Sequence, residues 1–209
     1  MSKSTFAAMC VAATVSASGT LSAPWAISQK YDPTAKKAII TITAKDNTWI
    51  GIGFGHGMPV GTDMIQCSVK VAAGTCFDMV SVGEMAPKAD TKQNITAFFK
   101  AGATAGTTDI TIMRDLDTQD TQDFVIPLDT EFNMSWSLND MTNNIGVKHT
   151  MDGDNTYMTF KSDGSQGVMV VKSSTDAHDD HDDHDDHDHS GATTIIAGAS
   201  LTLMAVALL

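Results

Sequence analysis

Apolar and polar residues alternate with a period of two along most of the chain between residues 25 and 172. The alternation is clearest in four segments, residues 38–44, 110–112, 124–128 and 134–138, and a continuous apolar run follows at residues 168–171. Turn-forming sequences separate the segments, at residues 32–33, 102–106, 152–154 and 163–164. Many short strands at this spacing, with no stretch of helical periodicity, predict an all-β antiparallel sandwich or barrel. We expect the immunoglobulin-like β-sandwich.

The two ends of the chain depart from this pattern. Residues 1–23 contain Lys3, an apolar stretch of small residues and two small-residue motifs, which is typical of a secretory signal peptide cleaved near Gly19 or Ala23. Residues 191–209 are apolar and uncharged, and as a helix they would span roughly 28 Å, close to the thickness of a bilayer core. We expect this tail to be a GPI-attachment signal or a retained membrane anchor. Either would place a secreted protein on the membrane at the cell surface.

Between these ends we expect one β domain, residues 24–172, and a disordered spacer, residues 173–190. The spacer holds a low-complexity tract of eight Asp and five His between residues 176 and 189. Imidazole and carboxylate groups bind divalent metals, and the candidate ligands are His178, His181, His184, His187 and His189. The alternative is a hydrated spacer that binds nothing, which is favoured because flexible ligands lose entropy on binding.

The net charge of the chain is −12, and the eight Asp of the tract leave about −4 for the rest. Nucleic-acid binding proteins carry a broad basic surface, so this charge excludes that class of partner.

Cysteine usage agrees with export from the cell. Cys10 falls in the signal segment, which leaves Cys67 and Cys76, nine positions apart. They could face each other across a hairpin and form a disulfide. Asn94 and Asn133 open Asn-X-Ser/Thr sequons, which are candidate glycosylation sites in a secreted protein. The chain contains no CxxCH motif, which excludes covalent c-type haem.

The most informative segment is WIGIGFGHGMPVGTDMIQC, residues 49–67. Its glycines remove side chains from an apolar strand, so a bulky group could approach the backbone there. The loop that follows presents His56 and Met58, and a second strand opens at Asp63. A thioether in such a gap is a possible ligand for a soft metal.

Of the seven histidines of the chain, only His56 and His149 lie outside the Asp-rich tract. If residues 145–151 alternate as a strand, His149 falls on an apolar face with Ile145, Val147 and Met151. The pattern alone favours a core histidine that is hydrogen-bonded to a carbonyl over a metal ligand.

Four segments in this order resemble the DOMON family, extracellular β-sandwich domains of which many bind haem b: residues 49–64, 87–90, 113–124 and 133–149. In the haem-binding members, a methionine of the glycine-rich loop and a histidine near the end of the domain are the axial ligands. The resemblance therefore implies non-covalent haem b held by Met58 and His149. His56 and Met64 lie close to Met58 in the sequence and could compete as ligands.

Other side chains are candidates for cofactor contact. Trp49, Phe54 and Trp136 could form apolar walls, although aromatic residues on a strand are equally typical of the core. Arg114 has the parity of the apolar residues before it and is expected to point inward, toward a carboxylate such as Asp63 or Asp120. A structural ion pair is favoured for Arg114 over contact with a haem propionate.

The resemblance implies a surface-anchored b-type cytochrome that transfers single electrons to or from a separate redox partner protein, and that is not itself an enzyme. His/Met ligation raises the reduction potential of haem iron, which suits electron transfer. Two alternatives are a DOMON module that binds carbohydrate or protein without haem, and divalent-metal binding by the Asp/His tract. The chain has no nucleophile elbow and no zinc-hydrolase motif.

Overall fold

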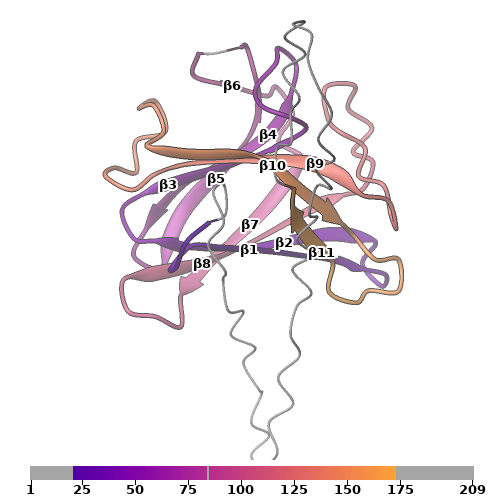
Figure 1. Ribbon diagram of the computed structural model, residues 1–209, viewed down its shortest axis with the longest axis horizontal. Helices are drawn as coiled ribbons and strands as arrows, with labels where there is room; N and C mark the ends of the chain where they lie inside the picture. Colours follow the sequence, from indigo (N-terminus) through magenta and orange to yellow (C-terminus); the bar gives the residue numbers. More distant parts are fainter. Residues whose placement is uncertain (1–20, 84, 173–209) are drawn as a thin grey trace, which may run out of the picture.

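The computed structural model describes residues 21–83 and 85–172, which form eleven β-strands and no helix. The strands make two antiparallel sheets that face each other, so the predicted all-β sandwich is confirmed (Figure 1). Most of the predicted signal peptide, the spacer with its His tract, and the hydrophobic tail lie outside the described residues. Within the described part of the chain, no helix is long and apolar enough to cross a membrane.

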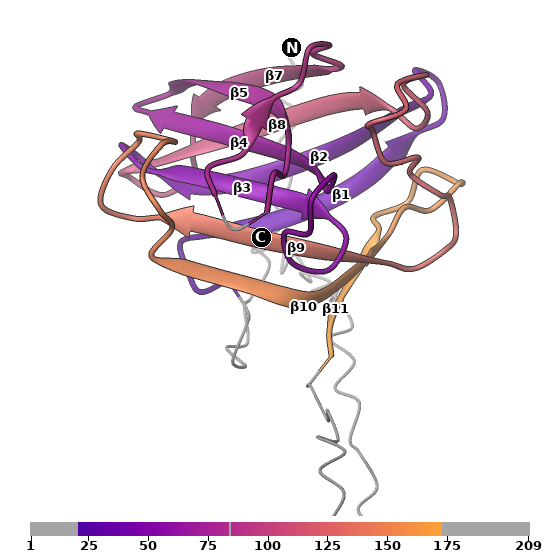
Figure 2. The ribbon, with the colours of Figure 1, turned by 90° about the horizontal axis from the view of Figure 1, so that it is seen from above.

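The smaller sheet has the strand order β1-β2-β8-β7. Its strands are β1 (Ala26–Asp32), β2 (Lys37–Lys45), β7 (Ile95–Ala101) and β8 (Thr107–Asp115). The larger sheet has the order β11-β10-β9-β3-β4-β5-β6. Its strands are β3 (Trp49–Phe54), β4 (Asp63–Lys70), β5 (Ala73–Val80), β6 (Lys88–Ala89), β9 (Phe132–Asn139), β10 (Met151–Thr159) and β11 (Val168–Val171). Figure 2 shows the two layers from above.

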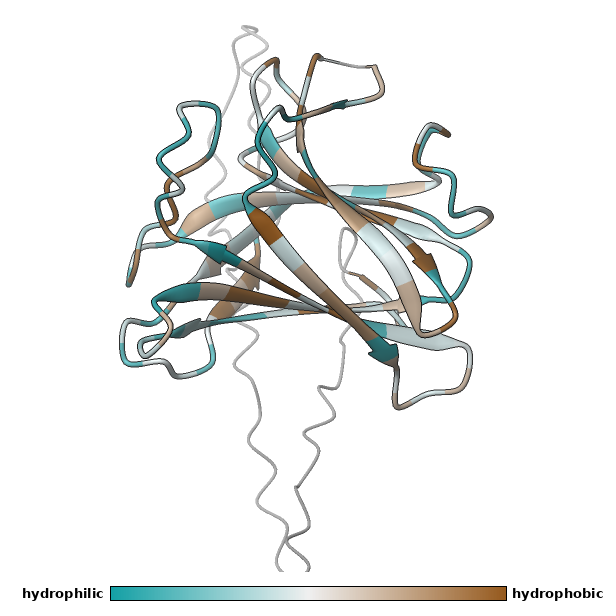
Figure 3. Ribbon diagram, turned by 180° about the vertical axis from the view of Figure 1, so that it is seen from behind, coloured by the Kyte–Doolittle hydropathy of each residue, from teal (hydrophilic) through white to brown (hydrophobic). Residues whose placement is uncertain are grey.

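The core lies between the two sheets and follows the alternation in the sequence. On β2 the buried residues are every second one, and the partners of Ile40 and Ile42 on β8 are Ile112 and Ile110. On β9, Met134, Trp136 and Leu138 share the core face, as their parity predicts. Hydrophobic and paler colours alternate along several strands in Figure 3. Side chains of opposite parity therefore point away from the core.

The predicted disulfide is present. Cys67 on β4 and Cys76 on β5 are direct partners in the antiparallel register, and their sulfur atoms are bonded. The bond ties together two strands of the larger sheet next to β3. Because Cys67 is completely buried in the core, this cross-link lies on the inner face of the sheet.

Two predicted strands are absent. Residues 124–128 form no strand beyond a single bridge at Leu128, although Ile126 is buried as its parity predicts. Residues 145–150 form a loop, and β10 begins only at Met151. The apolar face predicted for this segment does not exist, because Val147 and Met151 are exposed.

The described chain starts with a residue of the core. Leu21 is buried in the main hydrophobic cluster, and the carbonyl of Ser22 accepts a hydrogen bond from the Trp25 backbone amide. Signal cleavage near Gly19 would keep Leu21 in the mature chain, whereas cleavage at Ala23 would remove it.

Candidate functional site

A cavity of about 640 Å³ lies on the face of the larger sheet that points away from the core. This volume is within the usual range for small-molecule and cofactor sites. Its floor consists of outward-facing residues of three neighbouring strands, namely Trp49, Gly51 and Gly53 of β3, Gln66 of β4, and Ser135 and Ser137 of β9. The intervening residues of β3, Ile50 and Ile52, belong to the core. Alternation along β3 therefore separates the cavity floor from the core.

Glycines allow neighbouring side chains to pack closely against the strands that line this cavity. A Cβ atom at Gly53 would lie 2.6 Å from Oγ of Ser135, closer than real side chains approach. A Cβ atom at Gly153 of β10 would lie 2.8 Å from three atoms of the Trp136 indole. Glycine at position 153 therefore lets the Trp136 ring lie against β10, and this ring belongs to the core cluster and also lines the cavity.

Met58 and His149 both line the cavity, although they are 91 positions apart in the chain. Met58 lies in the loop after β3, and His149 lies in the loop after β9. Trp49 pairs with Asn139 and Phe54 pairs with Met134, so the two strands run in opposite directions. Their following loops consequently leave the sheet at opposite ends. A thioether and an imidazole thus border the same cavity from its two ends.

The loop that carries His149 is fixed to the sheet by side chains. Gln66 Nε2 donates to the carbonyl of Ile145 (3.3 Å), and Ser68 Oγ donates to the carbonyl of Asn143 (2.8 Å). At the end of β9, Asn139 Nδ2 donates to the carbonyl of Lys148 (2.7 Å). These bonds hold residues 143–148 over β4 and place His149 at the cavity wall.

The competing ligands lie in different places. Met64 lines the cavity and is nearly buried, so its thioether remains available there. The His56 side chain is 66% exposed and lies 3.6 Å from Asp154, and it is not among the residues that line the cavity. His149 is 26% exposed and lies 3.8 Å from Asp152. The core-histidine interpretation of His149 is therefore wrong, because its ring borders the cavity and faces a carboxylate.

Two predicted cofactor contacts, Phe54 and Arg114, are absent from the cavity wall. The parity of Phe54 on β3 directs its ring into the core, where it stacks on Phe124 with ring centroids 5.8 Å apart. Arg114 points inward from β8, and its guanidinium lies 4.9 Å from the centre of the Phe54 ring. Trp49 and Trp136 do line the cavity.

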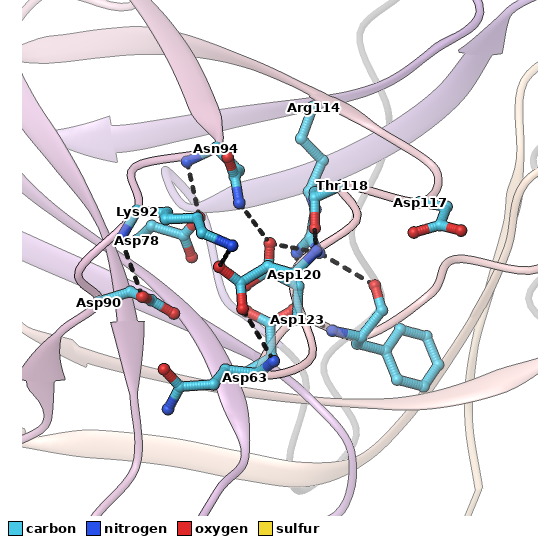
Figure 4. Close-up of polar contacts among 12 residues, drawn as sticks. Asp63, Asp78, Asp90, Lys92, Asn94, Arg114, Asp117, Thr118, Asp120 and Asp123 are labelled. Carbon is cyan, nitrogen blue, oxygen red and sulfur yellow. Dashed lines mark hydrogen bonds and ion pairs between the residues drawn. The ribbon is translucent and has the colours of Figure 1, made fainter.

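Arg114 is the centre of a buried ion network (Figure 4). Its Nη1 donates to Asp63 Oδ2 at 2.7 Å, which confirms one of the two carboxylates predicted as its partner. Its Nη2 donates to the carbonyl of Phe124 and lies 3.7 Å from Asp123 Oδ2. Carboxylate oxygens of Asp63, Asp78 and Asp123 lie within 4.8 Å of one another. One cation therefore faces three carboxyl groups, and Asp78 has no cation of its own.

Burial, followed by repulsion from Asp123, raises the pKa of Asp78 from 3.8 to about 7. Burial also raises the pKa of Asp63, with Arg114 acting in the opposite direction. Asp78 Oδ1 is buried and has no hydrogen-bond partner, and a protonated carboxyl would supply a donor there. The network thus holds an extra proton below neutral pH.

Replacing Asp78 with Asn is expected to stabilise the protein by about 2 kcal/mol more at pH 8 than at pH 5. The folded state binds a proton that the unfolded chain has lost above its own pKa near 3.8, so the stability of the wild type falls as pH rises from about 4 to 7. The Asn variant should lack this slope. Urea unfolding at both pH values measures the difference, with the exposed Asp115→Asn as control. Identical pH slopes for the Asp78→Asn variant and the wild type would contradict the assignment.

The two sequon asparagines use their side-chain nitrogens inside the fold. Asn94 Nδ2 donates to Asp123 Oδ2 (3.0 Å), and Asn133 Nδ2 donates to the carbonyl of Asp154 (2.9 Å). Asn133 lies on the outer face of β9, which is the face that carries the cavity. Glycosylation at either position remains a prediction, and a glycan would displace the bond at that asparagine.

The buried network and the cavity lie on opposite faces of the larger sheet. Residues 25–139 match the DOMON domain, which is more than half of the chain. The chain belongs to the DOMON family. The matched region includes Met58 and ends ten positions before His149. Its boundary coincides with the last residue of β9.

No curated protein matches the sequence of this DOMON chain. Among solved structures, it is similar to the cytochrome b domain of pyranose dehydrogenase from Coprinopsis cinerea, with 12% sequence identity and a TM-score of 0.49. The similarity covers 62% of this chain and 73% of that chain. At this level it supports no assignment of a cofactor or an activity.

Proposed function

We propose that this DOMON chain is a b-type cytochrome domain that binds haem b in the outer cavity, with Met58 and His149 as axial ligands. The observation that carries the proposal is the position of these two side chains, which border one cavity from loops at opposite ends of β3 and β9. Bound in this way, haem b would supply one-electron transfer at a potential raised by its His/Met ligation.

The residues that line the cavity fit such a group. Thioether and imidazole are established axial ligands of haem iron. Trp49, Trp136 and Met64 supply apolar wall surface, and the glycine floor lets a flat ring approach the backbone of β3. The hydroxyls of Ser135 and Ser137 lie beside Gly53 and Gly51 and form part of the same floor.

The remaining roles belong to residues of this chain. Gln66, Ser68 and Asn139 hold the loop of His149, and Ser135 Oγ donates to the carbonyl of Gly57, next to Met58. Both ligand loops are therefore attached to the sheet before any cofactor arrives. We propose that the chain relays electrons for a separate redox partner at the cell surface and turns over no substrate itself.

The test is haem uptake by the chain secreted from a haem-supplied host. We expect a low-spin Soret band in the oxidised protein and sharp α and β bands after reduction with dithionite. Haemin titration of colourless protein should give one equivalent per chain. A folded protein that stays colourless and takes up no haemin would overturn the proposal. It would favour the alternative of a carbohydrate-binding or protein-binding module, for which Trp49 and Trp136 are suitable contact residues.

A further inference from the structure

His149 faces one carboxylate at close range. Its Nδ1 lies 3.8 Å from Oδ2 of Asp152, three positions later on β10. The distance is longer than a hydrogen bond, but the Asp152 side chain is 68% exposed and is free to approach the ring. Polar contacts in ligand-free sites are often long and shorten when the ligand binds.

The backbone on both sides of His149 is fixed. Asn139 Nδ2 holds the carbonyl of Lys148, and the Thr150 amide donates to the carbonyl of Leu138 at 2.8 Å. The position of the imidazole is therefore set by β9, and the main remaining freedom is rotation of the ring and the choice of tautomer. A partner on Nδ1 would settle both.

We propose that Asp152 is the positioning residue of His149: its carboxylate accepts the Nδ1 proton and leaves Nε2 as the metal-binding nitrogen. The proposal rests on the function proposed above. A carboxylate on the second nitrogen of a ligating imidazole fixes its orientation and increases its basicity. A more basic imidazole favours ferric over ferrous iron, so Asp152 would lower the reduction potential.

The chain offers a matched control in Asp154. Asp152 and Asp154 are two positions apart on β10, and both line the cavity. Asp154 Oδ2, however, lies 3.6 Å from Nε2 of the exposed His56 and contacts the other histidine. Replacing either aspartate with Asn removes the same charge from the cavity wall. Only the change at position 152 removes the partner of His149.

The experiment compares wild type, Asp152→Asn and Asp154→Asn as full, haem-loaded chains, by redox titration and by the rate of haem transfer to apomyoglobin. We expect the reduction potential to rise more in Asp152→Asn than in Asp154→Asn. The expected difference is about tenfold in the ferric-to-ferrous affinity ratio, or about 59 mV for a one-electron couple. The haem of Asp152→Asn should also transfer about tenfold faster.

Equal shifts for the two variants would overturn the role of Asp152, because a general charge effect would then explain both. An unchanged potential in Asp152→Asn would overturn it as well. In either case the wild type would still bind haem, and the proposed function would stand. If the wild type binds no haemin, the proposed function fails, and the role of Asp152 fails with it.

Discussion

Replacing His149 with Ala is expected to lower haem affinity at least about 100-fold and to abolish the six-coordinate low-spin spectrum. Loss of a partner that merely orients a metal ligand costs about 10- to 100-fold, so loss of the ligand itself should cost no less. The protein should still fold, because His149 lies in a loop on the outer face and makes no contribution to the core. Haemin titration with circular dichroism measures both quantities.

The companion variant Met58→Ala should keep the histidine bond and shift the spectrum toward high-spin iron. His56→Ala and Met141→Ala are the matched controls, since neither residue lines the cavity. A normal spectrum in Met58→Ala together with a lost spectrum in His56→Ala would identify bis-histidine ligation. Loss in a Met64→Ala variant alone would assign the thioether ligand to β4.

The second large effect is expected inside the sandwich. Replacing Arg114 with Met should destabilise the fold by about 3–5 kcal/mol, because the change leaves Asp63, Asp78 and Asp123 buried with no cation among them. Methionine keeps the unbranched stem of arginine but lacks the guanidinium, so the loss combines the unpaired carboxylates with the space that the buried guanidinium leaves. Urea unfolding at pH 7 measures it.

The control for Arg114 is Lys37→Met, which removes a cation from the surface ion pair with Asp115. Exposed pairs of this kind contribute at most about 1 kcal/mol. The double variant Arg114→Met/Asp63→Asn should recover part of the lost stability, since it removes the carboxylate that was paired with the lost guanidinium. Equal losses of unfolding free energy in Arg114→Met and Lys37→Met would show that the buried network contributes no more to stability than a surface ion pair.

The alternation of apolar and polar residues predicted the strands well wherever one face of a strand is apolar and the other is polar. The parity of Arg114 predicted that it points inward and that Asp63 could be its partner, and both are confirmed. The prediction that Phe54 contacts a cofactor was wrong, because residues 49–54 are all apolar or glycine and their pattern does not show which face of β3 points to the core. The glycines at alternate positions mark the cavity face of β3. Phe54 has the parity of Ile50 and Ile52, which point into the core.

The loop of His149 could not be predicted from its own residues. Residues 145–151 alternate as a strand does, but the bonds that hold them as a loop come from Gln66 and Ser68, about 75 positions earlier in the chain. Asp78 was also missed. Asp78 lies two positions after Cys76 on β5 and therefore has the same parity. Since the disulfide of Cys76 faces the core, this parity predicts that the Asp78 carboxyl points into the core as well.

The separation of cavity and core by the two faces of β3 has a consequence for engineering. The loops at residues 55–62 and 140–150 supply the candidate ligands, while the residues that hold the sandwich together lie on the opposite side of the sheet. Both loops can therefore be exchanged or randomised as cassettes, with folding and ligand choice selected independently. A library built on these two segments would retain the scaffold and vary only what it binds.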